Sequence, residues 1–183
     1  MGANFVIQNC QSSFAEKIKI PEVFILEELI FKTPSLLLSY SKPNEYFKGI
    51  VYWAGKKTED GILITTAFLP KAIVTPISFR VNSFDNAVLV SKMNSLGLEL
   101  IAQVHSHPFG FKLTHCLAEE EAGFIPYDGL FSIIVPNYGL DGLLPLSKNG
   151  IYIFSNGKFV KLSEKQILSS FKIMPSIVNG SVL

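Results

Sequence analysis

Two short runs of nearly unbroken apolar residues place the strongest constraint on the fold. Residues 49–54 (GIVYWA) and 130–135 (LFSIIV) are rich in β-branched and aromatic side chains, and turn-forming residues follow both runs. Runs of this length and composition predict strands that are buried inside a sheet. Residues 62–69 repeat the pattern after a polar turn, so the first run is expected to form one arm of a hairpin.

The segment before these strands predicts a short strand at 18–20 and then a helix. Pro21 suits the first turn of a helix, and the apolar residues after it recur at helical spacing. They are Val23, Leu26, Leu29 and Ile30. We expect this helix to end near Thr33, because Pro34 disfavours helical geometry in the residue before it.

The rest of the chain mixes helices and strands. Asn156-Gly157 is a strong hairpin signal, and Ser163 with Gln166 forms a capping box that begins a last helix, to about Met174. The other expected elements are a strand at 77–81, a helix at 84–96 between Ser83 as N-cap and Gly97, a strand at 98–107, a short helix at 115–122 capped by Thr114, and strands at 151–154 and 158–162.

This order of elements predicts an α/β fold in which a mixed β-sheet is flanked by helices. The chain has 183 residues, 48% of them hydrophobic, which suits one compact domain. We expect residues 1–16 to be a loose N-terminal tail and residues 17–183 to form the domain.

Charge and cysteine content narrow the class of protein. Sixteen basic and fifteen acidic residues leave a net charge of +1, without the clustered Lys and Arg of a nucleic-acid surface. Cys10 and Cys116 have no zinc-finger spacing, and residues 1–15 do not resemble a signal peptide. No stretch approaches the ~18 apolar residues of a membrane span. These features predict a soluble, cytoplasmic protein that binds neither nucleic acid nor a membrane.

All three histidines of the chain lie between positions 105 and 115. His105 and His107 are two residues apart at the end of an expected strand, so their side chains should project from the same face. Pro108 ends that strand and would leave the pair at a rim with room for water or substrate. The acidic run at 119–121 could add a carboxylate, and two His with one carboxylate form a common catalytic zinc set.

Each of these features also has a structural interpretation. An HxH pair is often no more than two hydrogen-bonded histidines of a strand, and an acidic run is often the solvated face of a helix. Only their combination within seventeen residues favours a metal site.

Residues 101–139 (IAQVHSHPFGFKLTHCLAEEEAGFIPYDGLFSIIVPNYG) resemble the core of the JAMM (JAB/MPN) metalloprotease family, in particular its bacterial JAB branch. That family has an HxHP strand end, a loop, a Ser-x-x-Asp helix start and an apolar strand ending in Val-Pro. Residues 48–55 (KGIVYWAG) resemble an earlier strand of the family, and the resemblance spans roughly residues 20–140.

The resemblance implies a zinc-dependent isopeptidase that acts on conjugates of a ubiquitin-like protein, with one zinc per chain. His105 and His107 match the two His ligands, and Glu119 falls at the position of the Asp ligand. Cys116 falls at the position of the Ser that stabilises the tetrahedral intermediate, and Lys48 at that of the Glu that acts as general base.

Three of these five positions depart from the family pattern. Glu119 retains a carboxylate, and Cys116 is a weaker donor than serine or simply a small buried residue. Lys48 is the serious departure, because a charged ammonium cannot accept a proton and repels a divalent cation. Glu45, three residues upstream, is an alternative base if the register shifts.

Three functions therefore stay open. The first is a zinc isopeptidase with a modified or relocated base. The second is a catalytically inactive JAMM-fold protein that binds a ubiquitin-like protein or scaffolds a complex. In the third, a metal serves purely as a structural tie. Proteins of a conjugation pathway are the partners that the resemblance implies.

Overall fold

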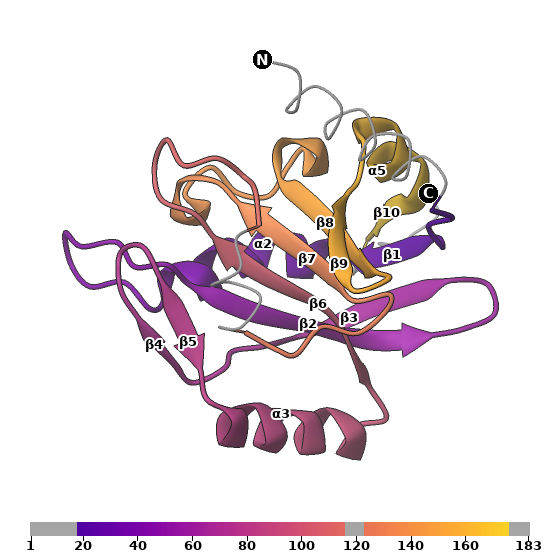
Figure 1. Ribbon diagram of the computed structural model, residues 1–183, viewed down its shortest axis with the longest axis horizontal. Coiled ribbons are helices and arrows are strands. Elements are labelled where there is room, and N and C mark those ends of the chain that lie inside the picture. The colour runs from indigo at the N-terminus through magenta and orange to yellow at the C-terminus, as the bar shows by residue number, and fades with distance from the viewer. Residues whose placement is uncertain (1–17, 116–122, 176–183) are drawn as a thin grey trace, which may run out of the picture.

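The computed structural model describes residues 18–115 and 123–175, which form a mixed eight-stranded sheet and a smaller two-stranded one (Figure 1). The strand order of the large sheet is β10-β1-β3-β2-β6-β7-β8-β9. Its strands are β1 (Val23–Leu26), β2 (Ile50–Lys57), β3 (Ile62–Phe68), β6 (Glu99–Ser106), β7 (Phe131–Val135), β8 (Gly150–Ser155), β9 (Lys158–Lys161) and β10 (Phe171–Met174). The small sheet pairs β4 (Ala72–Val74) with β5 (Phe79–Val81).

Parallel and antiparallel pairs both occur in the large sheet. β6 pairs parallel with β7, and β1 pairs parallel with both β10 and β3, whereas β2 pairs antiparallel with β3 and β6. This confirms the predicted α/β class with a mixed sheet. No helix in the described ranges is long and apolar enough to cross a membrane.

Helices cover both faces of the sheet. They are α2 (Glu27–Leu38), α3 (Ser83–Ser95) and α5 (Glu164–Ser170), with 3-10 turns η1 (Asn137–Gly139) and η2 (Leu146–Lys148). One core cluster contains side chains of α2 and α5, and the other contains Met93 of α3 with side chains of the β4–β5 hairpin. Figure 1 shows α3 and the β4–β5 hairpin on the side of the sheet opposite α5.

The central strands are buried on both faces, as their apolar runs predict. In β2, Val51 and Trp53 contribute to the first core cluster, while Ile50, Tyr52 and Ala54 contribute to the second. β7 is likewise buried along its whole length. A strand of this kind can carry few polar residues, which is why the sequence pattern identifies it.

The first predicted elements are wrong in position. The strand lies at Val23–Leu26 rather than 18–20, and α2 runs from Glu27 to Leu38 instead of from Pro21 to Thr33. Pairing of β1 between β3 and β10 buries Val23 and Ile25, which fixes an extended backbone there. α2 continues through Pro34 because Leu37, beyond it, is fully buried.

The other boundaries differ less. The last helix ends at Ser170 rather than Met174, and the next four residues pair with β1 as β10. The N-cap of α3 is Asn82 instead of Ser83. Gly97, with φ +65°, ends the α3 segment, and the capping box of Ser163 and Gln166 is confirmed. The expected helix at 115–122 and the tail boundary at residue 16 lie outside the described residues, His115 excepted.

Candidate functional site

The antiparallel pairing of β2 with β6 sets the geometry of the candidate site. Ile50 lies opposite His105, so continuing the register by two residues places Lys48 opposite His107. The backbone N–H of Ser106 donates to the Gly49 carbonyl over 3.0 Å, and the Gly49 N–H donates to Ser106 Oγ over 2.9 Å. Because residues two apart on a strand share a face, Lys48, His105 and His107 are directed to one side of the sheet.

The two imidazoles of the HxH pair lie side by side. The ring centroids of His105 and His107 are 5.3 Å apart, with the planes tilted by 42°. The relative exposure of His105 is 0% and that of His107 is 4%. The expectation that both rings project together is met, but the structure buries them instead of leaving them at an open rim.

His107 is held at three points. Its N–H donates to the Val135 carbonyl, its carbonyl accepts from the Tyr138 N–H, and its Nδ1 lies 2.9 Å from the carbonyl of Lys112. A carbonyl can only accept, so Nδ1 donates in this contact, and Nε2 is the ring nitrogen that is left for another partner. This is the ring orientation that metal-binding histidines usually have, with the second nitrogen bonded to a backbone oxygen.

The backbone that supports His107 is unusual. Asn137 and Tyr138 are consecutive non-glycine residues with φ of +52° and +56°. Left-handed conformations of this kind cost free energy in bulky residues and persist where the surrounding structure requires them. Here the Tyr138 hydroxyl donates to the Pro76 carbonyl over 3.1 Å, which ties η1 to the end of the β4–β5 hairpin.

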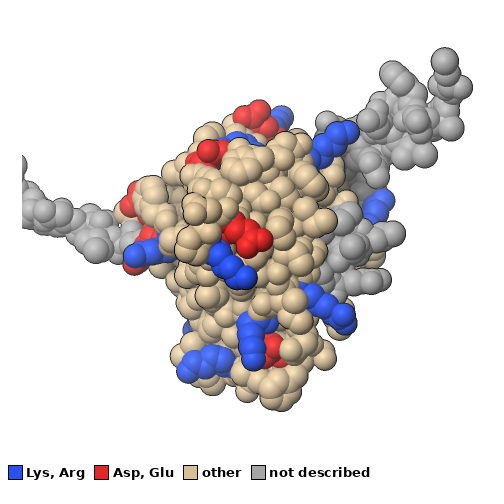
Figure 2. Space-filling model, turned by 90° about the vertical axis from the view of Figure 1, so that its left-hand side faces the viewer, with Lys and Arg blue, Asp and Glu red and all other residues tan. Residues whose placement is uncertain are grey.

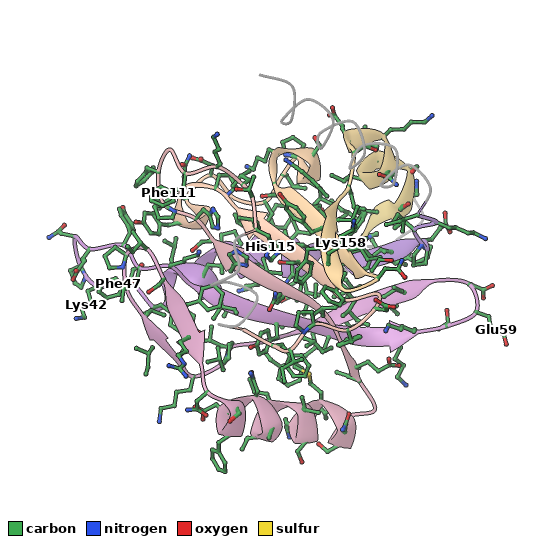
Figure 3. The ribbon with its side chains drawn as sticks, in the orientation of Figure 1. Lys42, Phe47, Glu59, Phe111, His115 and Lys158 are labelled. Carbon is green, nitrogen blue, oxygen red and sulfur yellow. The ribbon has the colours of Figure 1, made fainter. Side chains whose placement is uncertain are left out.

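His115 joins the same cluster, which the sequence did not assign. Its ring centroid lies 5.8 Å from that of His105, and its ring stacks on Phe159 at 4.2 Å with an interplanar angle of 2°. Figure 3 shows His115 beside the β8–β9 hairpin that carries Phe159. The available signal was its proximity in sequence to the HxH pair, but only the hairpin brings it against His105.

Lys48, two residues before β2, is a buried charged residue on the same face as this cluster. It is 4% exposed, and its Nζ lies 5.5 Å from the centroid of the Phe79 ring. That ring is itself 5.4 Å from the ring of His105. A buried ammonium gains from the face of an aromatic ring, so Phe79 stabilises a cation at this position.

The other predicted site residues are not brought into the cluster by the described structure. Cys116 and Glu119 lie outside the described residues. Glu45 is exposed in a tight turn whose backbone pairs with Lys42, so the observed register does not place it beside the histidines. Within the two described ranges, no group of three His, Cys, Asp or Glu is arranged to hold a metal ion.

The residues present therefore fit a zinc ion only in part. His105 and His107 supply two imidazoles in suitable proximity, and the hydrogen bond of His107 orients one of them. The ammonium of Lys48 on the same face opposes a divalent cation by charge repulsion.

Comparison with known proteins supports the fold but indicates no function. No profile of a known protein family matches the chain, and no curated protein matches it. A protein of Desulfitobacterium hafniense with a solved structure is similar, with 11% sequence identity, a TM-score of 0.57, and coverage of 86% of this chain and 97% of that chain. A Salinibacter ruber protein is 16% identical, with a TM-score of 0.50, over 76% of this chain and 88% of the other.

Proposed function

We propose that this chain is a catalytically inactive JAMM-fold protein that binds a ubiquitin-like protein, or its conjugate, without cleaving it. The buried Lys48 carries the proposal. It stands where the resemblance expects the general base, on the face of the sheet that carries His105 and His107, and Phe79 stabilises its charge. A protonated lysine neither accepts a proton from water nor tolerates a neighbouring divalent cation.

An aromatic surface next to the histidines supports a binding role. Tyr46 stacks on Tyr138 at 5.5 Å, and Phe109 packs edge-on against both rings at 6.0 and 5.5 Å. Tyr46, Phe109 and the nearby Phe111 are exposed. Figure 2 views the molecule from the side on which Figure 3 labels Phe111 and shows a mostly uncharged surface there. Exposed aromatic clusters of this kind are frequent at protein interfaces.

The second candidate is the zinc isopeptidase, with one zinc per chain and a base other than Lys48. The orientation of His107 by the Lys112 carbonyl favours it, because metal-binding histidines usually have their second ring nitrogen bonded to a backbone oxygen in this way. In this proposal His105 and His107 would hold the metal together with Glu119, and Cys116 would face the substrate. A bound zinc ion would supply an activated water and polarise the scissile carbonyl.

Both candidates imply the same partners and the same cellular location. The partners are a ubiquitin-like protein and other proteins of a conjugation pathway. The place of action that we propose is the cytoplasm, in keeping with two cysteines that share no disulfide-framework or zinc-finger spacing.

Metal content separates the two candidates. We expect the purified chain to contain well under one zinc per molecule, and Lys48→Glu to raise zinc binding by at least about tenfold, since the substitution turns a repelling charge into an attracting one. Calorimetric titration with zinc measures this. Lys112→Glu is the matched control, because it makes the same charge change on an exposed side chain of the adjacent loop. The gain should disappear in Lys48→Glu/His107→Ala.

Binding and cleavage complete the test. The unmodified chain should bind a ubiquitin-like protein in a sedimentation or calorimetric assay without cleaving its fusions, and Phe109→Ala should weaken that binding by about tenfold or more. Phe31→Ala, at a similarly exposed phenylalanine of α2, should leave it unchanged. Stoichiometric zinc together with chelator-sensitive cleavage by the unmodified chain would establish the isopeptidase instead.

A further inference from the structure

α3 leaves most of its surface uncovered, although many of its residues are apolar. Of its thirteen residues only Met93 is buried, while Phe84 is 74% exposed and Val88 is 51% exposed. These two side chains lie four residues apart and therefore form one stripe on the outer side of the helix. An apolar stripe of this kind on a surface helix indicates a surface that another protein covers.

A cavity of about 790 Å³ lies beside this stripe. The cavity is lined by mostly small or polar side chains of α3, by residues 80–82 before the helix, and by residues 123–125, of which Ile125 is 83% exposed. The α3 residues of the lining include Ala87, Ser91 and Asn94. The cavity has ample room for an aromatic ring, and it follows the stripe along the same helix.

The charged residues of α3 are placed so that those of one copy can pair with those of a second copy. Asp85 and Lys92 are seven residues apart, which places them on the same edge of the stripe and about 10 Å apart along the helix axis. Neither forms an ion pair with a residue of the described ranges. In an antiparallel pair of α3 helices related by a two-fold axis near Val88, Asp85 of each copy meets Lys92 of the other, at two places.

The same two-fold axis also brings surfaces of complementary shape together. When Asp85 lies opposite Lys92, Phe84 of one copy comes opposite the region of Ser91 and Asn94 in its partner. That region lines the cavity. A bulky ring thus faces small side chains and open space, twice per pair, as an isologous interface requires.

We infer that this chain forms a symmetric homodimer through α3, with Phe84 of each copy seated in the cavity between α3 and residues 123–125 of the other. The occupant of the surface is a second copy, because one symmetry operation pairs both the charges and the ring with its cavity. This interface lies on the side of the sheet that α3 covers and does not use the aromatic surface formed by Tyr46 and Phe109.

Sedimentation equilibrium of the full chain, without metal or partner, tests the inference. The expected mass at micromolar concentration is twice the chain mass of 20.3 kDa. Phe84→Asp and Val88→Lys should each reduce it to a single chain mass, because each places a charge inside the interface. Phe31→Asp, at a 63% exposed phenylalanine on the outer surface of α2, should remain dimeric. An unmodified chain that is monomeric at every concentration overturns the inference.

A charge exchange tests the symmetry itself. Lys92→Asp should weaken the dimer, since it sets two acidic side chains against each other at both places, and Asp85→Lys should do the same with two basic ones. The double variant Asp85→Lys/Lys92→Asp should recover the dimer. Because Asp85 also accepts a hydrogen bond from Asn82 at the N-cap, far-UV circular dichroism is used to verify that each variant is folded. Folded single variants that stay dimeric, or a folded double variant that stays monomeric, overturn the antiparallel arrangement.

Discussion

Thr33 connects α2 to the core of the sheet through its hydroxyl group. The hydroxyl of this fully buried residue donates to the Leu29 carbonyl over 2.7 Å and accepts from the indole N–H of Trp53 over 2.9 Å. Both partners lie in the protein interior, where a polar group that loses its hydrogen bond is not compensated by water.

We therefore expect Thr33→Val to lower the free energy of unfolding by about 1–3 kcal/mol, because it keeps the shape of the side chain but leaves the Trp53 N–H without an acceptor. Thr33→Ser is the control, since it retains the hydroxyl and loses only a methyl group. Urea unfolding followed by tryptophan fluorescence compares the two. Equal stability of the Val and Ser variants would show that the hydrogen bond contributes little.

At the scale of elements, the short helix α5 depends on its N-terminal cap. The Ser163 hydroxyl accepts from the Gln166 N–H over 3.3 Å, and the Gln166 side chain accepts from the Ser163 N–H over 3.0 Å. The helix has seven residues, too few to be stable without its cap and its packing through Ile167. The strand β10 follows it directly, so the position of the helix also fixes the edge of the sheet.

Ser163→Ala should consequently lower stability by about 1 kcal/mol, and the loss should be concentrated in α5 and β10. Hydrogen exchange of the backbone amides of residues 166–173, alongside thermal unfolding, measures both effects. Ser163→Asp provides the comparison, because its carboxylate can still accept from the helix N-terminus. Uniform loss of protection across the whole sheet in the Ala variant would contradict a local role of the cap.

For the molecule as a whole, partly or fully buried tyrosines with a raised pKa make its stability depend on pH in the alkaline range. Burial, and to a smaller extent the charge of Glu99, raises the pKa of Tyr127 to about 12, and its hydroxyl donates to the Leu100 carbonyl. Burial also raises the pKa of Tyr40 and Tyr52. In the unfolded chain a tyrosine loses its proton near pH ~10.

Below about pH 10 these tyrosines are protonated in both states, so their contribution to stability is fully present. Between about pH 10 and 12 the unfolded state releases protons that the folded state keeps, so the free energy of unfolding must fall as the pH rises. Urea midpoints measured across this range should show the decline. Tyr127→Phe should be less stable at neutral pH but should show a shallower decline, and an unchanged slope would exclude Tyr127 from this effect.

Local signals were sufficient for the elements whose cause lies within a few residues. The Asn156-Gly157 turn, with φ of +52° and +77°, and the Ser163 cap lie where the sequence places them. The apolar runs of β2 and β7 are buried strands, and the HxH pair projects from one face because alternation along a strand is a local property. Pairing partners, depth of burial and the identity of a bound group are not local, so they did not follow from these patterns.

The features that local patterns did not predict depend on contacts between segments that are distant in the chain. Val23–Leu26 is a strand because it pairs with residues 62–64 and 171–174, and no pattern inside four residues records that gain in hydrogen bonds and burial. The approach of His115 to His105, and the burial of Lys48 against Phe79, equally depend on strands that are distant in the chain. Local patterns were enough to indicate which segments form elements and which side chains share a face. Only the packing of the sheet, through contacts between remote segments, decided which of those side chains meet.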